Sequence, residues 1–179
     1  MTDEQLIAGC IANDRESQQK LFSANAGKFK TLCLRYMKDD MEAEDVLIEG
    51  FFKIFSKIKS YRGDGSFEGW MRRIIVNTAI NKIRKNTLSK LKYVDEYHDD
   101  SLSFDYVPGT ELEAQHLLKL IGELPVGYRT VFNMYAIDGF SHNEIAKTLG
   151  IDSGTSRSQL AKARSFLKRR LVETSSQLN

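Results

Sequence analysis

Two helix-boundary signals near the C-terminus constrain the fold of this chain more than any other feature. Ser141 and Glu144 form the S-x-x-E pattern of a capping box, which predicts that a helix begins there. Gly150 supplies a left-handed residue that ends this helix, and Asp152 or Ser153 then offers a cap for a second one. Two short helices joined by a turn with glycine form a helix-turn-helix, whose second helix enters the major groove of DNA.

The second of these helices is strongly basic. From Arg157 to Arg170, counting both, there are six basic residues and no acidic one. A surface that carries only positive charge can neutralise the phosphates of DNA. A solvated basic face is the alternative explanation for such a helix taken alone, but the capped two-helix unit favours DNA binding. The side chains expected to reach base edges or nearby phosphates lie in its first turns: Thr155, Arg157, Ser158, Lys162 and Arg164.

Composition predicts an all-α chain. Of the 179 residues, 41% are hydrophobic and only two are prolines, and no segment alternates as a strand does. No apolar run approaches the ~20 residues of a membrane span, and no signal-peptide pattern is present, so we expect no membrane insertion and a cytoplasmic location. Cys10 and Cys33 lie on apolar helical faces without metal-ligand spacing, which predicts buried thiols. We expect no cofactor, no metal site and no enzymatic activity, since no phosphate loop, nucleophile elbow or metal cluster is found.

Charge divides the chain into three parts. Residues 1–87 carry 15 basic and 12 acidic residues, residues 88–110 carry two and five, and residues 111–179 carry nine and seven. Two mildly basic units thus flank an acidic segment, which predicts two small helical domains joined by a flexible linker. We call residues 1–87 the N-terminal unit and residues 111–179 the C-terminal unit.

Two predicted helices of the N-terminal unit carry surface chemistry. The first, over about residues 41–59, has a continuous apolar stripe with its charges elsewhere; core packing with a solvated charged face accounts for that pattern on spacing alone. The second, over about residues 67–86, follows the loop SYRGDGS and carries amides and guanidinium groups on one face: Arg73, Asn77, Asn81 and Arg84. Amides can bond bases and cations can hold phosphates, although a solvated helix with core aromatics is the favoured explanation of this helix taken alone.

Several motifs follow one another over about residues 5–172: Ala43-Glu44-Asp45-Val46, Phe51-Phe52, SYRGDGSFEGWMRRIIVNTAINKIRK, Leu124-Pro125 with Tyr128-Arg129, and the helix-turn-helix. In this order and spacing they resemble a bacterial RNA polymerase sigma factor of the sigma-70 family. The resemblance is to the small extracytoplasmic-function (ECF) group, which keeps only the second and fourth sigma domains.

The resemblance implies a promoter-specificity subunit that binds core RNA polymerase and promoter DNA, and that an anti-sigma factor masks. It implies that residues 1–87 are the sigma region 2 domain, residues 88–110 the linker and residues 111–179 the sigma region 4 domain. Core polymerase would contact Glu44, Asp45, Glu49 and Phe52. The −10 promoter element would be captured and melted by Tyr61, Arg62, Trp70, Arg73, Asn77, Asn81 and Arg84. The −35 element would be read by the five residues of the basic helix named above.

Three positions depart from the family pattern. Ile48 stands where a glutamine is frequent, and Ser156 replaces the usual aliphatic residue of the recognition helix. Gly50 interrupts the docking helix at a cost of about 1 kcal/mol relative to alanine, which predicts a close approach of another helix. The alternative function is a helix-turn-helix regulator that binds duplex DNA without acting as a polymerase subunit; the amide-and-arginine face and the docking helix argue against it.

Overall fold

The structure, a computed structural model, describes residues 2–37, 39–90 and 112–177. Every regular element in these ranges is helical, so the predicted all-α class is confirmed. Most of the predicted linker, residues 91–110, lies outside the described residues. Within the described ranges, no helix combines the length and the apolar character needed to cross a membrane.

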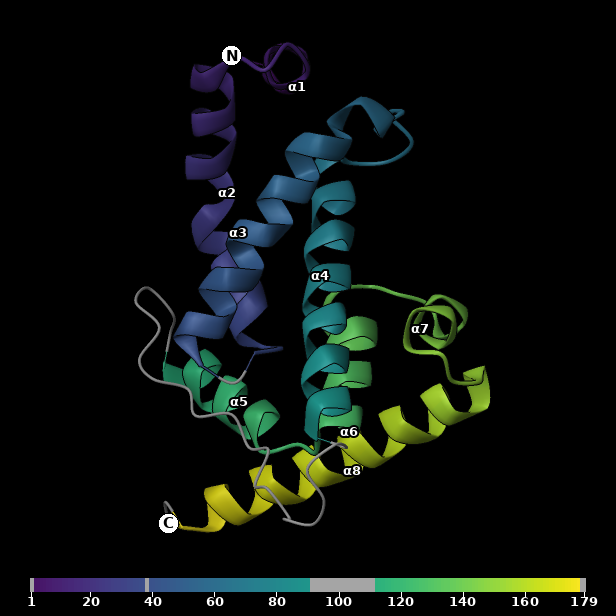
Figure 1. Ribbon diagram of the computed structural model, residues 1–179. Coiled ribbons are helices and arrows are strands. Elements are labelled where there is room, and N and C mark those ends of the chain that lie inside the picture. The colour runs from purple at the N-terminus through teal and green to yellow at the C-terminus, as the bar shows by residue number, and fades with distance from the viewer. Residues whose placement is uncertain (1, 38, 91–111, 178–179) are drawn as a thin grey trace.

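The helices fall into two groups along the chain (Figure 1). The first group comprises α1 (Asp3–Ile11), α2 (Arg15–Leu34), α3 (Asp40–Lys57), the short η1 (Ile58–Ser60) and α4 (Phe67–Lys90). The second comprises α5 (Leu112–Gly122), α6 (Val126–Phe132), the π-helical turn η2 (Asn133–Ile137), α7 (His142–Leu149) and α8 (Ser153–Gln177).

Side-chain caps set the ends of the helix-turn-helix where the sequence predicts them. Ser141 and Glu144 form the complete capping box at the start of α7. Gly150 adopts φ 70°, the left-handed conformation that ends this helix. Asp152, not Ser153, caps α8, because its carboxylate accepts a hydrogen bond from the backbone N–H of Thr155 at 2.8 Å.

The core of the first group lies between α2, α3 and α4. Phe29 of α2, Ile54 of α3 and Ile75 of α4 are all completely buried in one hydrophobic cluster, as the apolar stripe of α3 predicts. A Cβ atom added at Gly50 would run into the Cδ1 atom of Ile75. The glycine therefore allows α3 and α4 to approach closely, which confirms the expectation for this position.

Both cysteines are free and buried in this group, as predicted. Burial raises the pKa of the Cys33 thiol to about 12, and burial together with the nearby Asp14 carboxylate raises the pKa of Cys10. Neither thiol carries a charge near neutral pH.

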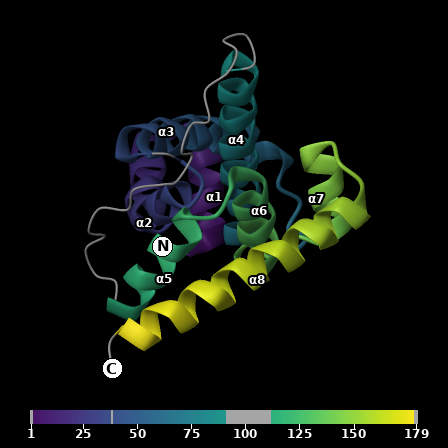
Figure 2. The same cartoon turned by 90° about the horizontal axis from the view of Figure 1, so that it is seen from below.

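The second group packs against the first through α6, η2 and α7. Helix α8 crosses beneath them in the view of Figure 1 and lies toward the viewer in Figure 2. A small separate cluster of Leu120, Leu124 and Leu167 joins α5 to α8. The side chains of Met134 and Ile145 instead belong to the same buried cluster as the core of the N-terminal unit. The two units thus share apolar packing across their boundary.

Candidate functional site

One face of α3 is exposed although it carries large apolar side chains. Met41 and Phe52 are each 72% exposed and Ile48 is 54% exposed. With the exposed acidic residues Glu44, Asp45 and Glu49 they form what we call the docking face. The sequence predicts a role for the three acidic residues and Phe52, whereas the exposure of Met41 and Ile48 is seen only in the structure. Their spacing from Asp45 and Phe52, in steps of three and four, is the signal that places them on this face.

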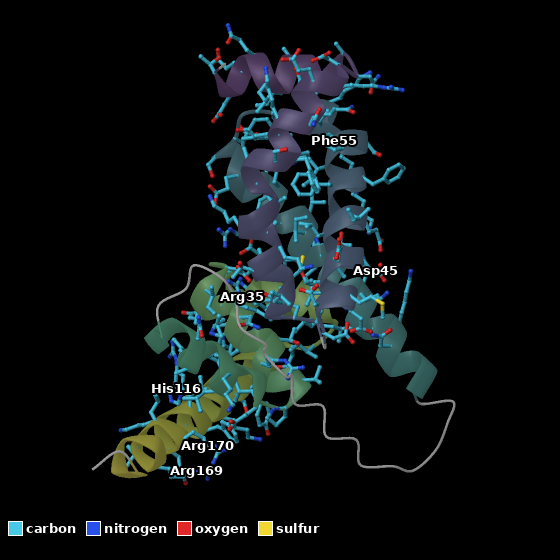
Figure 3. The ribbon with its side chains drawn as sticks, turned by 90° about the vertical axis from the view of Figure 1, so that its left-hand side faces the viewer. Arg35, Asp45, Phe55, His116, Arg169 and Arg170 are labelled. Atoms are coloured by element: carbon cyan, nitrogen blue, oxygen red, sulfur yellow. The ribbon has the colours of Figure 1, made fainter. Side chains whose placement is uncertain are left out.

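Each carboxylate of the docking face has an intramolecular partner in an exposed pair, and the shortest of these pairs is the hydrogen bond that Glu49 accepts from the Nζ atom of Lys53 at 2.6 Å. Asp45 lies 3.5 Å from the Nζ atom of Lys82, and Glu44 lies 3.5 Å from that of Lys30. Figure 3 shows Asp45 at the outer side of α3, in the half of that helix nearer the second group of helices. Exposed ion pairs of this kind contribute only about 0–1 kcal/mol each to stability. A cationic partner surface can therefore replace the lysines as the partner of these carboxylates with little loss of free energy.

Three aromatic rings gather beside the start of α4. The rings of Phe67 and Trp70 stack with centroids 5.7 Å apart, and the ring of Tyr61 lies 5.0 Å from Phe67 and 5.6 Å from Trp70. The Tyr61 hydroxyl donates a hydrogen bond to the Gly65 carbonyl at 2.8 Å, which closes the loop. Tyr61 and Trp70 are half-buried, whereas Arg62 on the same loop is exposed. The cluster therefore offers partly open aromatic surface next to the polar side of α4.

The polar face of α4, which we define as Arg73, Asn77, Asn81 and Arg84, is exposed along its length. The side chains of Asn77 and Asn81 make no hydrogen bond within the described ranges of the chain. Arg73, however, forms an ion pair with Glu144 of α7 at 2.5 Å, and Arg84 donates to the Thr148 carbonyl at the end of the same helix. Two of the predicted DNA-binding cations are thus held by the C-terminal unit, which the sequence does not predict.

The first turns of α8 present an exposed cationic surface. Arg157, Ser158, Lys162 and Arg164 are all exposed. Thr155 is half-buried, and its hydroxyl donates to the capping Asp152 carboxylate at 2.5 Å. These hydrogen bonds lower the pKa of Asp152. Thr155 is therefore engaged in the helix cap, and the other four predicted residues are available to a ligand.

The serine that departs from the family pattern has a structural partner. Ser156 is completely buried where α7 crosses α8, and its hydroxyl shares a hydrogen bond with the Nδ1 atom of His142 at 2.8 Å. The imidazole also stacks on Tyr135, with ring centroids 4.3 Å apart. Burial and the charges of Arg157 and Arg164 lower the pKa of His142. The polar pair fixes the crossing of the two helices at a place where an aliphatic side chain was expected.

Replacing Glu144 with glutamine is expected to flatten the acid dependence of stability. The hydrogen bond from Arg73, followed by those from Ser141, lowers the pKa of Glu144 from 4.5 to about 2. The stabilisation is therefore present above pH 4.5 and is lost as the pH falls toward 2. Because glutamine also completes a capping box, the variant loses the ion pair and keeps the cap.

Urea unfolding between pH 5 and pH 2.5 measures this effect. The wild-type midpoint should fall further than that of Glu144→Gln, with a small difference at neutral pH because both side chains are partly exposed. Arg73→Gln, which removes the same pair from its other side, should flatten the curve in part, because the hydrogen bonds from Ser141 still lower the pKa of Glu144. Parallel curves for the wild type and both variants would contradict the pair as the cause.

Comparison with known proteins adds two family matches. The family model described as Sigma-70 region 2 matches residues 21–88, and that described as Sigma-70, region 4 matches residues 114–167. The ECF RNA polymerase sigma-E factor of Haemophilus influenzae is 26% identical, over 96% of this chain and 96% of its own length. The RNA polymerase sigma-H factor of Pseudomonas aeruginosa is 28% identical, over 94% of this chain and 93% of its own length. The ECF RNA polymerase sigma factor SigE of Mycolicibacterium smegmatis is 28% identical over 90% of this chain, which spans only 64% of that relative.

Two solved structures have a similar fold. The sigma factor RpoE, crystallised with the anti-sigma factor NepR from Bartonella quintana, matches with a TM-score of 0.60 and 19% identity, over 86% of this chain and 95% of that one. CnrH, in complex with the cytosolic domain of CnrY, matches with a TM-score of 0.56 and 19% identity, over 96% of this chain and 97% of that one. At this level of identity the likeness concerns the arrangement of helices.

Proposed function

Because this chain belongs to the extracytoplasmic-function group of the sigma-70 family, we propose that it binds core RNA polymerase and directs transcription initiation at a specific set of promoters. The observation that carries the proposal is the docking face of α3, where Phe52 is 72% exposed beside a row of carboxylates. An exposed apolar surface of this kind marks a protein-binding site, and a polymerase subunit requires one.

The two units divide the work in this proposal. Residues 1–87 form the region 2 domain, which docks on polymerase through α3 and binds and melts the −10 element through α4. Residues 111–179 form the region 4 domain, which reads the −35 element, and residues 88–110 connect them. The ranges of the two family matches, 21–88 and 114–167, support this division.

Capture of an unpaired base at the −10 element is the role we propose for the aromatic cluster and the α4 amides. Extruding a base costs a few kcal/mol, and stacking on an aromatic side chain returns about 1–3 kcal/mol. Tyr61 and Trp70 supply the rings, and Asn77 and Asn81 supply amides that can bond base edges. Arg62, Arg73 and Arg84 supply charge for the adjoining phosphates.

Reading of the −35 element falls to the start of α8. A recognition helix contacts base edges with the side chains of its first turns, and Arg157, Ser158, Lys162 and Arg164 are exposed there. Thr155 contributes by holding the cap. We propose no catalytic residue in this chain, since nucleotide addition belongs to the polymerase, and we place its action in the cytoplasm, where promoter DNA and polymerase are found.

An anti-sigma factor is the regulatory partner we propose. The two structurally similar proteins were both solved in complexes, RpoE with the anti-sigma factor NepR and CnrH with the cytosolic domain of CnrY. A masking protein of this kind would cover the exposed apolar side chains of α3 and so exclude polymerase.

Substituting Asn77 with alanine is expected to slow promoter opening about 5- to 160-fold, because one lost base contact costs about 1–3 kcal/mol. Formation of the closed complex should change little, since the duplex presents no extruded base at that stage. Opening is measured with a fluorescent base analogue in the −10 element, and closed-complex formation by gel shift at low temperature. Asn25→Ala on α2, whose amide bonds only the Leu21 carbonyl of its own helix, is the control. Equal slowing of both steps would assign Asn77 to general DNA affinity instead.

The function itself is tested by run-off transcription. The purified chain is mixed with bacterial core RNA polymerase and fragmented genomic DNA of the source organism. Discrete transcripts that are absent with core polymerase alone are the expected result. Absence of transcripts, together with tight duplex binding by the free chain, would favour the regulator instead.

A further inference from the structure

A polar pair lies inside the helix-turn-helix where the family pattern has an aliphatic side chain. Ser156 of α8 is completely buried, and its hydroxyl lies 2.8 Å from the Nδ1 atom of His142 on α7. Figure 2 shows α7 beside the first turns of α8. A buried hydroxyl without a partner destabilises a fold. Because the imidazole supplies that partner, the position of α8 against α7 depends on a hydrogen bond between the two helices.

The same imidazole contacts a second element of the C-terminal unit. Its ring stacks on that of Tyr135 in η2, with the centroids 4.3 Å apart and the planes inclined by 18°. The guanidinium carbon of Arg164 in turn lies 5.9 Å from the centroid of the Tyr135 ring, which is within the range of a cation–π contact. A series of contacts therefore runs from His142 through Tyr135 to Arg164, one of the exposed cations at the start of α8.

The backbone that carries the imidazole is itself fixed. His142 is the first residue of α7 and directly follows Ser141, whose side chain and that of Glu144 form the capping box. A capping box satisfies two backbone N–H groups of the first turn and so holds its geometry. The Glu144 carboxylate also pairs with Arg73 of α4 at 2.5 Å, which engages the acidic group closest to His142 along α7. The ring of His142 therefore projects toward α8 and η2 from a well-defined backbone position.

We propose that His142 is a positioning residue for recognition of the −35 element. It fixes the place of α8 through Ser156 and that of Arg164 through Tyr135, and DNA binding at α8 is coupled to the uptake of a proton by its imidazole. His142 acts on the DNA through the side chains that it places and does not itself contact a base. This inference rests on the proposed function, which identifies the DNA as the −35 element.

The charges around His142 account for the coupling to a proton. In the free chain, burial and then the positive charges of Arg157 and Arg164 on α8 lower the pKa of His142 from its ordinary value of 6.5. Phosphates bound by these two arginines offset their charges, so DNA binding raises the pKa of His142 toward 6.5. A group whose pKa rises on binding takes up protons, and the affinity for DNA therefore increases as the pH falls through this range.

A double-mutant cycle tests the positioning role. The single variants His142→Phe and Ser156→Ala each leave one polar group without its partner, whereas His142→Phe/Ser156→Ala places a ring against an apolar neighbour. The probe is a duplex enriched from a random-sequence pool by the immobilised wild-type chain, alone or with core polymerase. The measured quantity is the specificity ratio, which is the affinity for this duplex divided by the affinity for a shuffled duplex of the same composition.

Each single variant should lower the specificity ratio about fivefold or more, which corresponds to the loss of one base contact. The double variant should recover the ratio to within about twofold of the wild type. The control is His116→Phe/Ser23→Ala, which makes the same changes at exposed positions of α5 and α2 and should leave the ratio unchanged. Single variants that match this control overturn the proposal. A double variant no better than the single variants also overturns it, because a residue that contacts DNA directly is not replaced by phenylalanine.

Proton uptake is measured on the unaltered chain and so does not depend on the folding of any variant. Isothermal titration calorimetry with the enriched duplex at pH 6.5, the ordinary pKa of histidine, is carried out in two buffers of different ionisation enthalpy. The heats should differ between the buffers in the sense of proton uptake for the wild type and for His116→Phe, but not for His142→Phe/Ser156→Ala. No uptake by the wild type, or uptake that persists in this double variant, overturns the proposal.

Run-off transcription separates this proposal from the proposed function. If the wild type enriches a duplex but yields no transcripts, the proposed function fails, and the mutant cycle still decides the role of His142 for the duplex that α8 recognises. If transcripts appear while the single variants keep the specificity ratio of the control, the positioning role alone fails. A wild-type chain that enriches no duplex also overturns the positioning role, since α8 then recognises no sequence.

Discussion

Substituting Asp45 with arginine and Phe52 with alanine is expected to abolish transcription by preventing binding to core polymerase, while the chain remains folded. Central interface residues of this kind cost about 2–4 kcal/mol each when removed, which is about 30- to 1000-fold in affinity. The carboxylate of Asp45 is 64% exposed and lies 3.5 Å from the Nζ atom of Lys82, and Phe52 is 72% exposed. Since surface substitutions usually change stability by no more than about 0.5 kcal/mol, the fold should survive both.

Affinity for fluorescently labelled core polymerase and urea unfolding are the two measurements. Glu16→Arg with Ile11→Ala is the matched control, because it makes the same kinds of change at exposed positions of α2 and α1. The control should keep its affinity for polymerase. If the Asp45 and Phe52 variant binds as tightly as this control, polymerase docks elsewhere on the chain.

Replacing Arg157 and Lys162 with alanine is expected to reduce transcription from a −35-dependent promoter by about 5- to 160-fold for each residue. Both side chains are exposed in the first three turns of α8, and a lost base contact costs about 1–3 kcal/mol. The Nζ atom of Lys162 also lies 5.9 Å from the centroid of the Tyr128 ring. This contact holds the lysine side chain against the C-terminal unit. Binding of core polymerase should be unaffected, because these residues lie far from α3 along the chain and on the other unit.

The control for this prediction removes the same charge farther along the same helix. Lys168→Ala/Arg169→Ala deletes two exposed cations of α8, so it changes the general attraction to phosphate without touching the first turns. Run-off transcription from promoters with and without the −35 element is the measurement. A similar loss for both pairs of substitutions would mean that α8 acts by charge alone and does not read sequence.

Local signals account for most of what the sequence predicts correctly. The capping box of Ser141 with Glu144 and the left-handed Gly150 are determined by neighbouring backbone groups, so a short stretch of sequence contains all the information needed. The apolar stripe of α3 likewise follows from spacing alone. Gly50 indicates the close approach of another helix, because a glycine inside a helix costs about 1 kcal/mol relative to alanine and that cost is accepted where two helices pack closely.

Contacts between distant residues are what the sequence does not reveal. In the sequence, Arg73 stands among other basic residues and has no acidic neighbour to pair with. The fold brings Glu144, 71 positions away, to a distance of 2.5 Å between its Oε1 atom and the Nη1 atom of Arg73. Ser156 looks like a poor recognition-helix residue until His142 is placed against its hydroxyl. Asp138 gives no signal at all, since its donors are Arg35 and Tyr36 from the turn after α2 and Arg72 from α4. The polar face of α4 is therefore identified correctly as an exposed face, but its occupation by the other unit requires the tertiary structure.

The burial of both thiols makes the chain convenient for reporter chemistry. Cys10 and Cys33 are inaccessible, and burial holds the pKa of Cys33 at about 12, so neither presents a reactive thiolate to a maleimide at neutral pH. New cysteines placed on exposed positions of α2 and α8 would then be the sites of labelling, with both native residues left in place. Pairs of dyes attached in this way can follow the distance between the two units in single molecules during promoter opening.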